Sequence, residues 1–169
     1  ATYQHGGKRN KHPKIMNKEN TYTQLLPQIA AMIEGETCET SVLANVAAAL
    51  HQAFDQFFWT GFYMLHPDGM LRLGPFQGPP ACYAIAIGKG VCGKAFEAES
   101  TLVVPDVEQF PGHIACSALS RSEIVVPIFS KVGKCVGVLD IDSTQLGTFD
   151  ATDKLYLEQV VQQLTRTLY

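Results

Sequence analysis

The chain has 169 residues, of which 46% are hydrophobic and 17% charged. This length suits one domain with a proper core, and no apolar run approaches the roughly 18 to 20 residues that a membrane span needs. The net charge is −3, and broad binding to nucleic acid needs a basic face, so we expect neither nucleic acid nor a membrane as a partner.

Residues 1–19 differ from the rest in charge, because they hold five Lys or Arg side chains against one Glu. They lack the apolar stretch of about 7 to 15 residues that a secretory signal contains. We therefore expect a disordered tail at 1–19 and a single domain at 20–169. An odd number of cysteines without such a signal favours a reducing compartment, so we expect a cytoplasmic protein.

Two amphipathic helices are predicted at the start of the domain. Apolar residues recur at helical spacing over 22–33, and Pro27 places the start of this helix near Thr23, because proline is tolerated in a first turn. The same spacing recurs over 43–54 and indicates a second helix, which ends near the aromatic run that begins at Phe57.

Two β-hairpins are predicted next. Residues 57–65 favour a strand and stop at Pro67-Asp68-Gly69, a turn sequence, after which residues 70–73 resume the pattern. Residues 123–129 and 135–141 are rich in Val and Ile and flank a second turn. We expect this second pair to be central strands of a sheet.

The last helix begins after Asp150, a good N-cap residue, and carries apolar residues at i, i+3 and i+4 over 157–168. Helices at both ends and hairpins between them predict an α+β domain, with an antiparallel sheet and the terminal helices packed on one face. Residues 74–122 are dense in Gly and Pro, with brief strands expected only at 83–87 and 101–104. Such long irregular connections are usually functional or disordered, and we expect them to form a pocket.

Three of the five cysteines, Cys82, Cys92 and Cys116, lie in this irregular region. A reactive thiol must be partly exposed and ionised, and a resolving thiol must be able to reach it. Loops satisfy both requirements. The commoner alternative is that a free cysteine is a small buried hydrophobe, an interpretation that suits Cys38 and Cys135.

Asp140 and Asp142 are two residues apart in an apolar run, so their side chains share one face if residues 136–141 form a strand. Two acids on such a face are costly unless they bind a ligand or are solvated. The alternative is that the strand has ended by Asp140 and both acids cap a turn.

Several motifs in the same order resemble the free methionine-(R)-sulfoxide reductases. They are Trp59-Thr60-Gly61-Phe62-Tyr63, Leu73 to Gly78, Ala81-Cys82, Gly88 to Gly93, Gly112-His113-Ile114-Ala115-Cys116, Ser122-Glu123-Ile124-Val125 and Gly137 to Ser143. The resemblance covers the chain from about Tyr22 to Leu164.

The resemblance implies a GAF-type domain that reduces free methionine sulfoxide. Cys116 would be the nucleophile and would become a sulfenic acid, and Cys82 or Cys92 would then form the disulfide that thioredoxin reduces. Loop chemistry alone leaves the choice between Cys82 and Cys92 open. The relatives also suggest a homodimer, and neither a cofactor nor a metal is implied.

Glu123, Asp140 and Asp142 match acidic positions of the family pocket. One protonated carboxyl there would hand a proton to the sulfoxide oxygen while another holds the substrate ammonium, which requires separated pKa values. Trp59 and Tyr63 would form an aromatic wall for the methylthio group, although without the resemblance they would be assigned to the core.

Three other functions fit parts of the sequence. Gly88-x-Gly90-x-x-Gly93 resembles a dinucleotide-binding fingerprint. The stretch from Tyr83 to Val104 around it is too short, however, for a βαβ unit of about 30 residues. A structural zinc site could be formed by Cys82, Cys92, His113 and Cys116. These residues lack the short spacing between ligands that common zinc motifs have. A non-enzymatic GAF sensor is the strongest rival, and the lack of an output domain after the last helix favours an enzyme.

Overall fold

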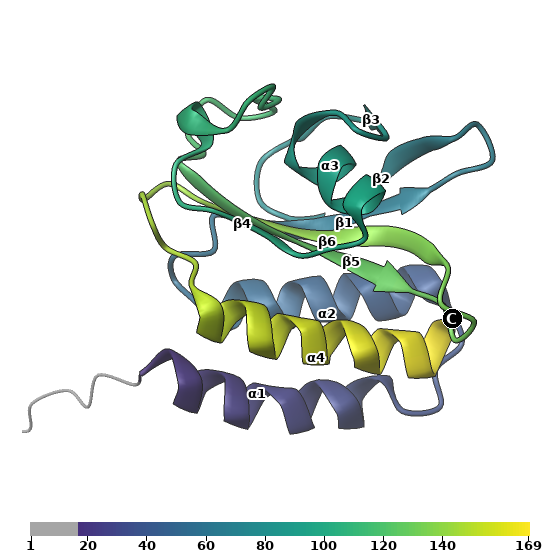
Figure 1. Ribbon diagram of the computed structural model, residues 1–169. Coiled ribbons are helices and arrows are strands. Elements are labelled where there is room, and N and C mark those ends of the chain that lie inside the picture. The colour runs from purple at the N-terminus through teal and green to yellow at the C-terminus, as the bar shows by residue number, and fades with distance from the viewer. Residues whose placement is uncertain (1–16) are drawn as a thin grey trace, which may run out of the picture.

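The structure, a computed structural model, describes residues 17–169 (Figure 1). Most of the predicted basic tail, residues 1–16, lies outside the described residues. The elements in chain order are α1 (Lys18–Ile33), α2 (Glu39–Ala53), β1 (Trp59–Leu65), β2 (Met70–Gln77), β3 (Ala84–Ala86), α3 (Gly90–Ala98), β4 (Leu102–Val104), a 3-10 helix (Val107–Gln109), β5 (Ser122–Phe129), β6 (Cys135–Ser143) and α4 (Ala151–Leu168).

The strands form one six-stranded sheet in the order β3-β2-β1-β6-β5-β4, and every neighbouring pair is antiparallel. The two predicted hairpins, β1–β2 and β5–β6, meet where β1 pairs with β6 at the centre of the sheet. Both predicted hairpins are therefore confirmed. The short strands expected at 83–87 and 101–104 are also present, as the two edges β3 and β4.

Helices α2 and α4 cover one face of the sheet, and α1 lies beyond them as a further layer (Figure 1). The larger hydrophobic cluster fills the space between this face and the helices. The opposite face carries α3 and the loops around it, over a smaller second cluster. This arrangement confirms the α+β class, with the terminal helices on one side and the loops on the other.

Helix α1 begins at Lys18 rather than near Thr23, so Pro27 lies inside it. Asn17 caps the helix, because its side chain accepts a hydrogen bond from the backbone N–H of Asn20 at 2.8 Å. Proline removes the helical donor to the carbonyl four residues before it, here that of Thr23. Both Pro27 and Thr23 are exposed, so solvent can satisfy that carbonyl and the helix continues.

Two other expectations from the sequence are wrong. The stretch 74–122 is not irregular throughout, because it contains α3, which buries Val91, Cys92 and Ala95. Cys38 is exposed at the N-terminus of α2 instead of buried, whereas Cys135 is buried as expected. Within residues 17–169, no helix is long and apolar enough to cross a membrane.

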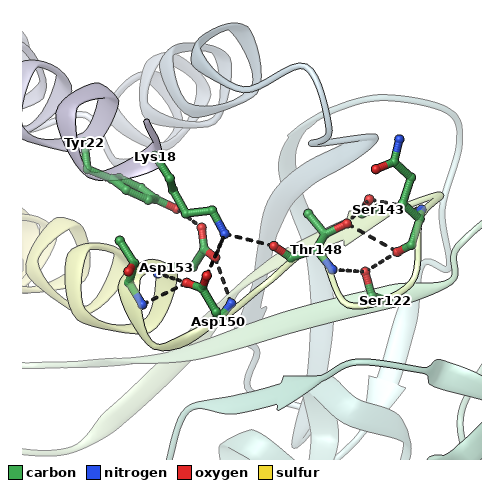
Figure 2. A network of polar contacts seen from close by, with 9 residues as sticks. Lys18, Tyr22, Ser122, Ser143, Thr148, Asp150 and Asp153 are labelled. Carbon is green, nitrogen blue, oxygen red and sulfur yellow. Dashed lines mark hydrogen bonds and ion pairs between the residues drawn. The ribbon is translucent and has the colours of Figure 1, made fainter. Parts of the chain in front are cut away.

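A partly buried polar network ties α1 to the start of α4 (Figure 2). Asp153 is fully buried, and it accepts hydrogen bonds from Tyr22 Oη and from Lys18 Nζ, each at 2.6 Å. Asp150 and Asp153 also form a capping box at the first turn of α4, which confirms Asp150 as the predicted cap. Lys18 reaches on to the carbonyl of Thr148 at 2.9 Å, so one cation joins the start of α1 to the segment that leads into α4.

Candidate active site

One cavity lies on the sheet face opposite α2 and α4. Seven of the eight side chains singled out from the sequence line it, and they are Trp59, Tyr63, Cys92, Cys116, Glu123, Asp140 and Asp142. The eighth, Cys82, is joined to Cys116 by a disulfide. The structure thus brings together residues that come from three strands, α3 and two loops.

Strand register explains why the acids meet. Glu123 on β5 and Trp59 on β1 both lie opposite Asp142 on β6, and side chains two apart on a strand share a face. Because β6 continues to Ser143, Asp140 and Asp142 both belong to the strand. The alternative that they cap a turn is wrong.

Gly61 lies opposite Asp140, between Trp59 and Tyr63 on β1. A Cβ at this position would lie 2.6 Å from the Trp59 ring and 2.4 Å from Phe76 Cβ, so only glycine lets the indole lie against the strand. The Trp59 and Tyr63 rings are stacked, with 5.9 Å between their centroids. They form a continuous wall of the cavity.

The same two aromatic residues hold the loop that carries Cys82. Tyr63 Oη donates a hydrogen bond to the carbonyl of Cys82 at 2.9 Å, and Trp59 Nε1 donates one to the carbonyl of Pro79 at 3.1 Å. Cys82 and Cys116 are 34 residues apart in the chain, and their Cα atoms are 5.4 Å apart. Because these two sulfurs are bonded to each other, the zinc set considered from the sequence does not form in this state.

The described chain has clear relatives among known proteins. Residues 37–168 match the GAF domain family. GAF domain-containing protein A of Dictyostelium discoideum is 53% identical over 88% of this chain and 92% of its own length. The free methionine-R-sulfoxide reductase of Escherichia coli is 44% identical over 90% of this chain and 92% of its own.

The fold of this chain is also similar to that of a solved structure. The free methionine-R-sulfoxide reductase of Neisseria meningitidis in complex with its substrate superposes with a TM-score of 0.87 at 49% identity, covering 92% of this chain and 93% of that chain. The chain belongs to the GAF-domain free methionine-R-sulfoxide reductase family.

The cavity of this GAF domain gathers three carboxyl groups. Glu123 and Asp140 are each only 5% exposed, and Asp142 is partly buried beside them. Burial raises the pKa of all three carboxyls, and repulsion from neighbouring acids raises the pKa of Glu123 and Asp142 further. Burial also raises the pKa of the Cys92 thiol, whose Sγ lies 3.9 Å from Glu123 Oε1.

His113 is the basic group nearest to these acids, with its Nε2 at 3.8 Å from Glu123 Oε2. Burial lowers the pKa of this imidazole, which favours its neutral form at neutral pH. Among the described residues, no Lys or Arg forms an ion pair with Glu123, Asp140 or Asp142. The pocket therefore suits a ligand that brings its own positive charge.

Sequence reasoning gave no role to some residues that line the pocket. Ser117 and Ser120 lie in the loop after Cys116 and face the cavity, as does Gly90 at the start of α3. None of these positions shows a periodic pattern. The sequence signals that could have indicated them are the segments around Cys116 and from Gly88 to Gly93, which resemble the family.

Glu123→Gln is expected to stabilise the fold at neutral pH more than at acidic pH. A carboxyl whose pKa is raised by folding contributes to stability at pH values below its ordinary pKa. This contribution is lost as the pH rises through the pKa of the carboxyl in the folded protein. The Tm of the variant minus the Tm of the parent should therefore be about 2 to 4 °C higher at about pH 8 than at about pH 4. This shift corresponds to a change of about 1 kcal/mol in the free energy of unfolding. Exposed Glu97→Gln is the matched control. An equal Tm difference at both pH values would contradict this assignment.

Proposed function

We propose that the protein reduces free methionine-(R)-sulfoxide to methionine, with Cys116 as the nucleophile. The observation that carries the proposal is the cavity itself, in which a disulfide-forming cysteine lies beside buried acids and an aromatic wall. Relatives that bear the name free methionine-R-sulfoxide reductase, from Escherichia coli and Saccharomyces cerevisiae, support it.

The chemical step would begin with attack of the Cys116 thiolate on the sulfoxide sulfur. The sulfur–oxygen bond of the substrate breaks, the oxygen ends on Cys116 as a sulfenic acid, and methionine leaves reduced by two electrons. A resolving thiol then condenses with the sulfenic acid, which releases water and forms a disulfide.

The acids would divide two tasks. Glu123 is a suitable proton donor to the sulfoxide oxygen, because burial and the neighbouring acids raise its pKa and keep it protonated at a higher pH. Asp140 and Asp142 would hold the substrate ammonium, which supplies the positive charge that the pocket lacks. Trp59 and Tyr63 would contact the methylthio group through their ring faces.

Cys82 is the better candidate for the resolving thiol, because it is the partner of Cys116 in this structure. In this form the cavity has about 40 Å³ of free space, which is enough for a few water molecules. A disulfide on Cys116 leaves no thiol for attack on the sulfoxide, so this state would correspond to the end of the reaction, and reduction would restore the nucleophile. Both cysteines are partly exposed, as attack by a dithiol protein such as thioredoxin requires.

The activity is tested by coupling turnover to thioredoxin, thioredoxin reductase and NADPH. We expect oxidation of NADPH with the free R epimer of methionine sulfoxide and none with the S epimer. A GAF sensor would bind without chemistry, so methionine sulfoxide would consume no thiol in the reduced protein. That outcome would overturn the proposal.

The double variant Cys82→Ser/Cys92→Ser is expected to keep its first turnover and lose steady-state activity. Both resolving candidates are absent, so the sulfenic acid on Cys116 should persist and be trapped by a dimedone probe. We expect at least a tenfold fall in the thioredoxin-coupled rate, while one equivalent of methionine is still released. The single variant Cys38→Ser is the control, and full coupled activity in the double variant would contradict the role of both thiols.

A further inference from the structure

A second constellation lies within the cavity, at its buried end. Cys92 Sγ and one carboxylate oxygen each from Glu123 and Asp140 all lie within 4.8 Å of one another, and all three residues are buried. They come from α3, β5 and β6, so no spacing motif along the chain marks them.

The Cys92 thiol donates a hydrogen bond to Glu123 Oε1 at 3.9 Å, but one oxygen of the cluster is left without a partner. Asp140 Oδ1 is buried and has no hydrogen-bond partner. His113, the nearby base, is shifted toward its neutral form by burial, which lowers its pKa. Burying acids without a partner is costly, so a small cation that bound all three side chains would relieve the cost.

We propose that Cys92, Glu123 and Asp140 bind Zn²⁺ in the state that holds the Cys82–Cys116 disulfide. One sulfur and two carboxylate oxygens are a ligand set that zinc accepts, whereas Mg²⁺ and Ca²⁺ take oxygen ligands. Cys92 loses its proton to solvent when it coordinates the ion, and so does each of the two carboxyls that is protonated. A water molecule would complete the tetrahedron.

The size of the site agrees with this occupant. Zinc bonds of about 2.3 Å to sulfur and about 2.0 to 2.2 Å to oxygen place tetrahedral ligands roughly 3.5 Å apart. The Cys92 Sγ to Glu123 Oε1 distance is 3.9 Å, so small side-chain shifts suffice. The free space of about 40 Å³ in the cavity also has room for an ion with its water.

Zinc at this position would also block the next catalytic cycle, a consequence that rests on the proposed function. It would occupy two of the acids assigned to the substrate and remove Cys92 from thiol exchange. We therefore expect zinc and methionine sulfoxide to exclude each other, so that zinc inhibits the reductase from within its own pocket.

The test uses the full chain with Cys38→Ser as the parent, because the exposed Cys38 thiol would otherwise bind metal. The Cys82–Cys116 disulfide is formed first, and Zn²⁺ and Co²⁺ are added without substrate. We expect one Zn²⁺ per chain by titration calorimetry and a thiolate-to-cobalt charge-transfer band. Since no turnover is measured, the result is independent of whether the reductase activity is found.

Two variants decide which residues hold the ion. Cys92→Ser should abolish the cobalt band, and Asp140→Asn should weaken zinc binding by about tenfold or more. Cys135→Ser, at the other buried free cysteine, should bind zinc like the parent. Circular dichroism confirms that each variant is folded. The proposal is overturned if the parent shows no saturable zinc binding, or if Cys92→Ser or Asp140→Asn binds zinc as tightly as the parent.

Discussion

Cys116→Ser is expected to release methionine from free methionine-(R)-sulfoxide at least about 10³-fold more slowly than the parent protein. A serine hydroxyl stays protonated near neutral pH and is a poor nucleophile toward sulfur, so the step that breaks the sulfur–oxygen bond should fail. The measurement is methionine released in a single turnover by the reduced protein, without thioredoxin.

The single-turnover design separates chemistry from recycling and from folding. Cys38→Ser and Cys135→Ser, which change cysteines outside the disulfide, should release methionine at the parent rate, and any loss of their activity should be accompanied by a lower Tm. Methionine release by Cys116→Ser at a rate near that of the parent would show that another thiol is the nucleophile.

N-Acetylation of the substrate is expected to lower the rate of reduction by about 10²-fold or more. The acetylated R epimer has no ammonium, so Asp140 and Asp142 would face an uncharged amide. Leaving a buried charged group without its partner costs about 3 kcal/mol or more, which corresponds to about two powers of ten in rate. The measurement is methionine or N-acetylmethionine release under one thioredoxin-coupled assay.

A variant of the acids makes this result specific. Asp142→Asn should slow reduction of the free substrate but affect the acetylated substrate much less, so the ratio between the two rates should shrink. Exposed Glu97→Gln should leave that ratio unchanged. Comparable rates on the free and acetylated substrates in the parent would mean that the acids do not bind the ammonium.

Periodic segments of the chain were predictable because burial sets their pattern. The β5–β6 hairpin has a continuous Val and Ile core, and α4 has both a cap at Asp150 and an apolar stripe. The start of α1 was not predictable, since tolerance of Pro27 depends on the exposure of Thr23, which only the packed structure determines. Helix α3 was missed because glycines at its beginning hide a short apolar stripe.

The parts of the site that follow from local spacing were predictable, whereas contacts between distant segments were not. The spacing of Asp140 and Asp142 places them on one face of any strand, whatever the fold. The pairing of Cys82 with Cys116 depends on two loops that are far apart in sequence, and the residues alone left Cys92 as an alternative. The meeting of Cys92 with Glu123 and Asp140 depends on how α3 lies over the sheet, which no local pattern encodes.

The sheet divides the molecule into a side that carries the larger hydrophobic cluster and a side that carries the pocket. Most of the apolar burial that stabilises the fold is thus on the side away from the chemistry. Substitutions and insertions in the loops over the pocket can alter ligand preference without removing the contacts of α2 and α4 with the sheet. Such a scaffold has wide evolutionary latitude, because new specificities can arise on one side while selection for folding acts mainly on the other.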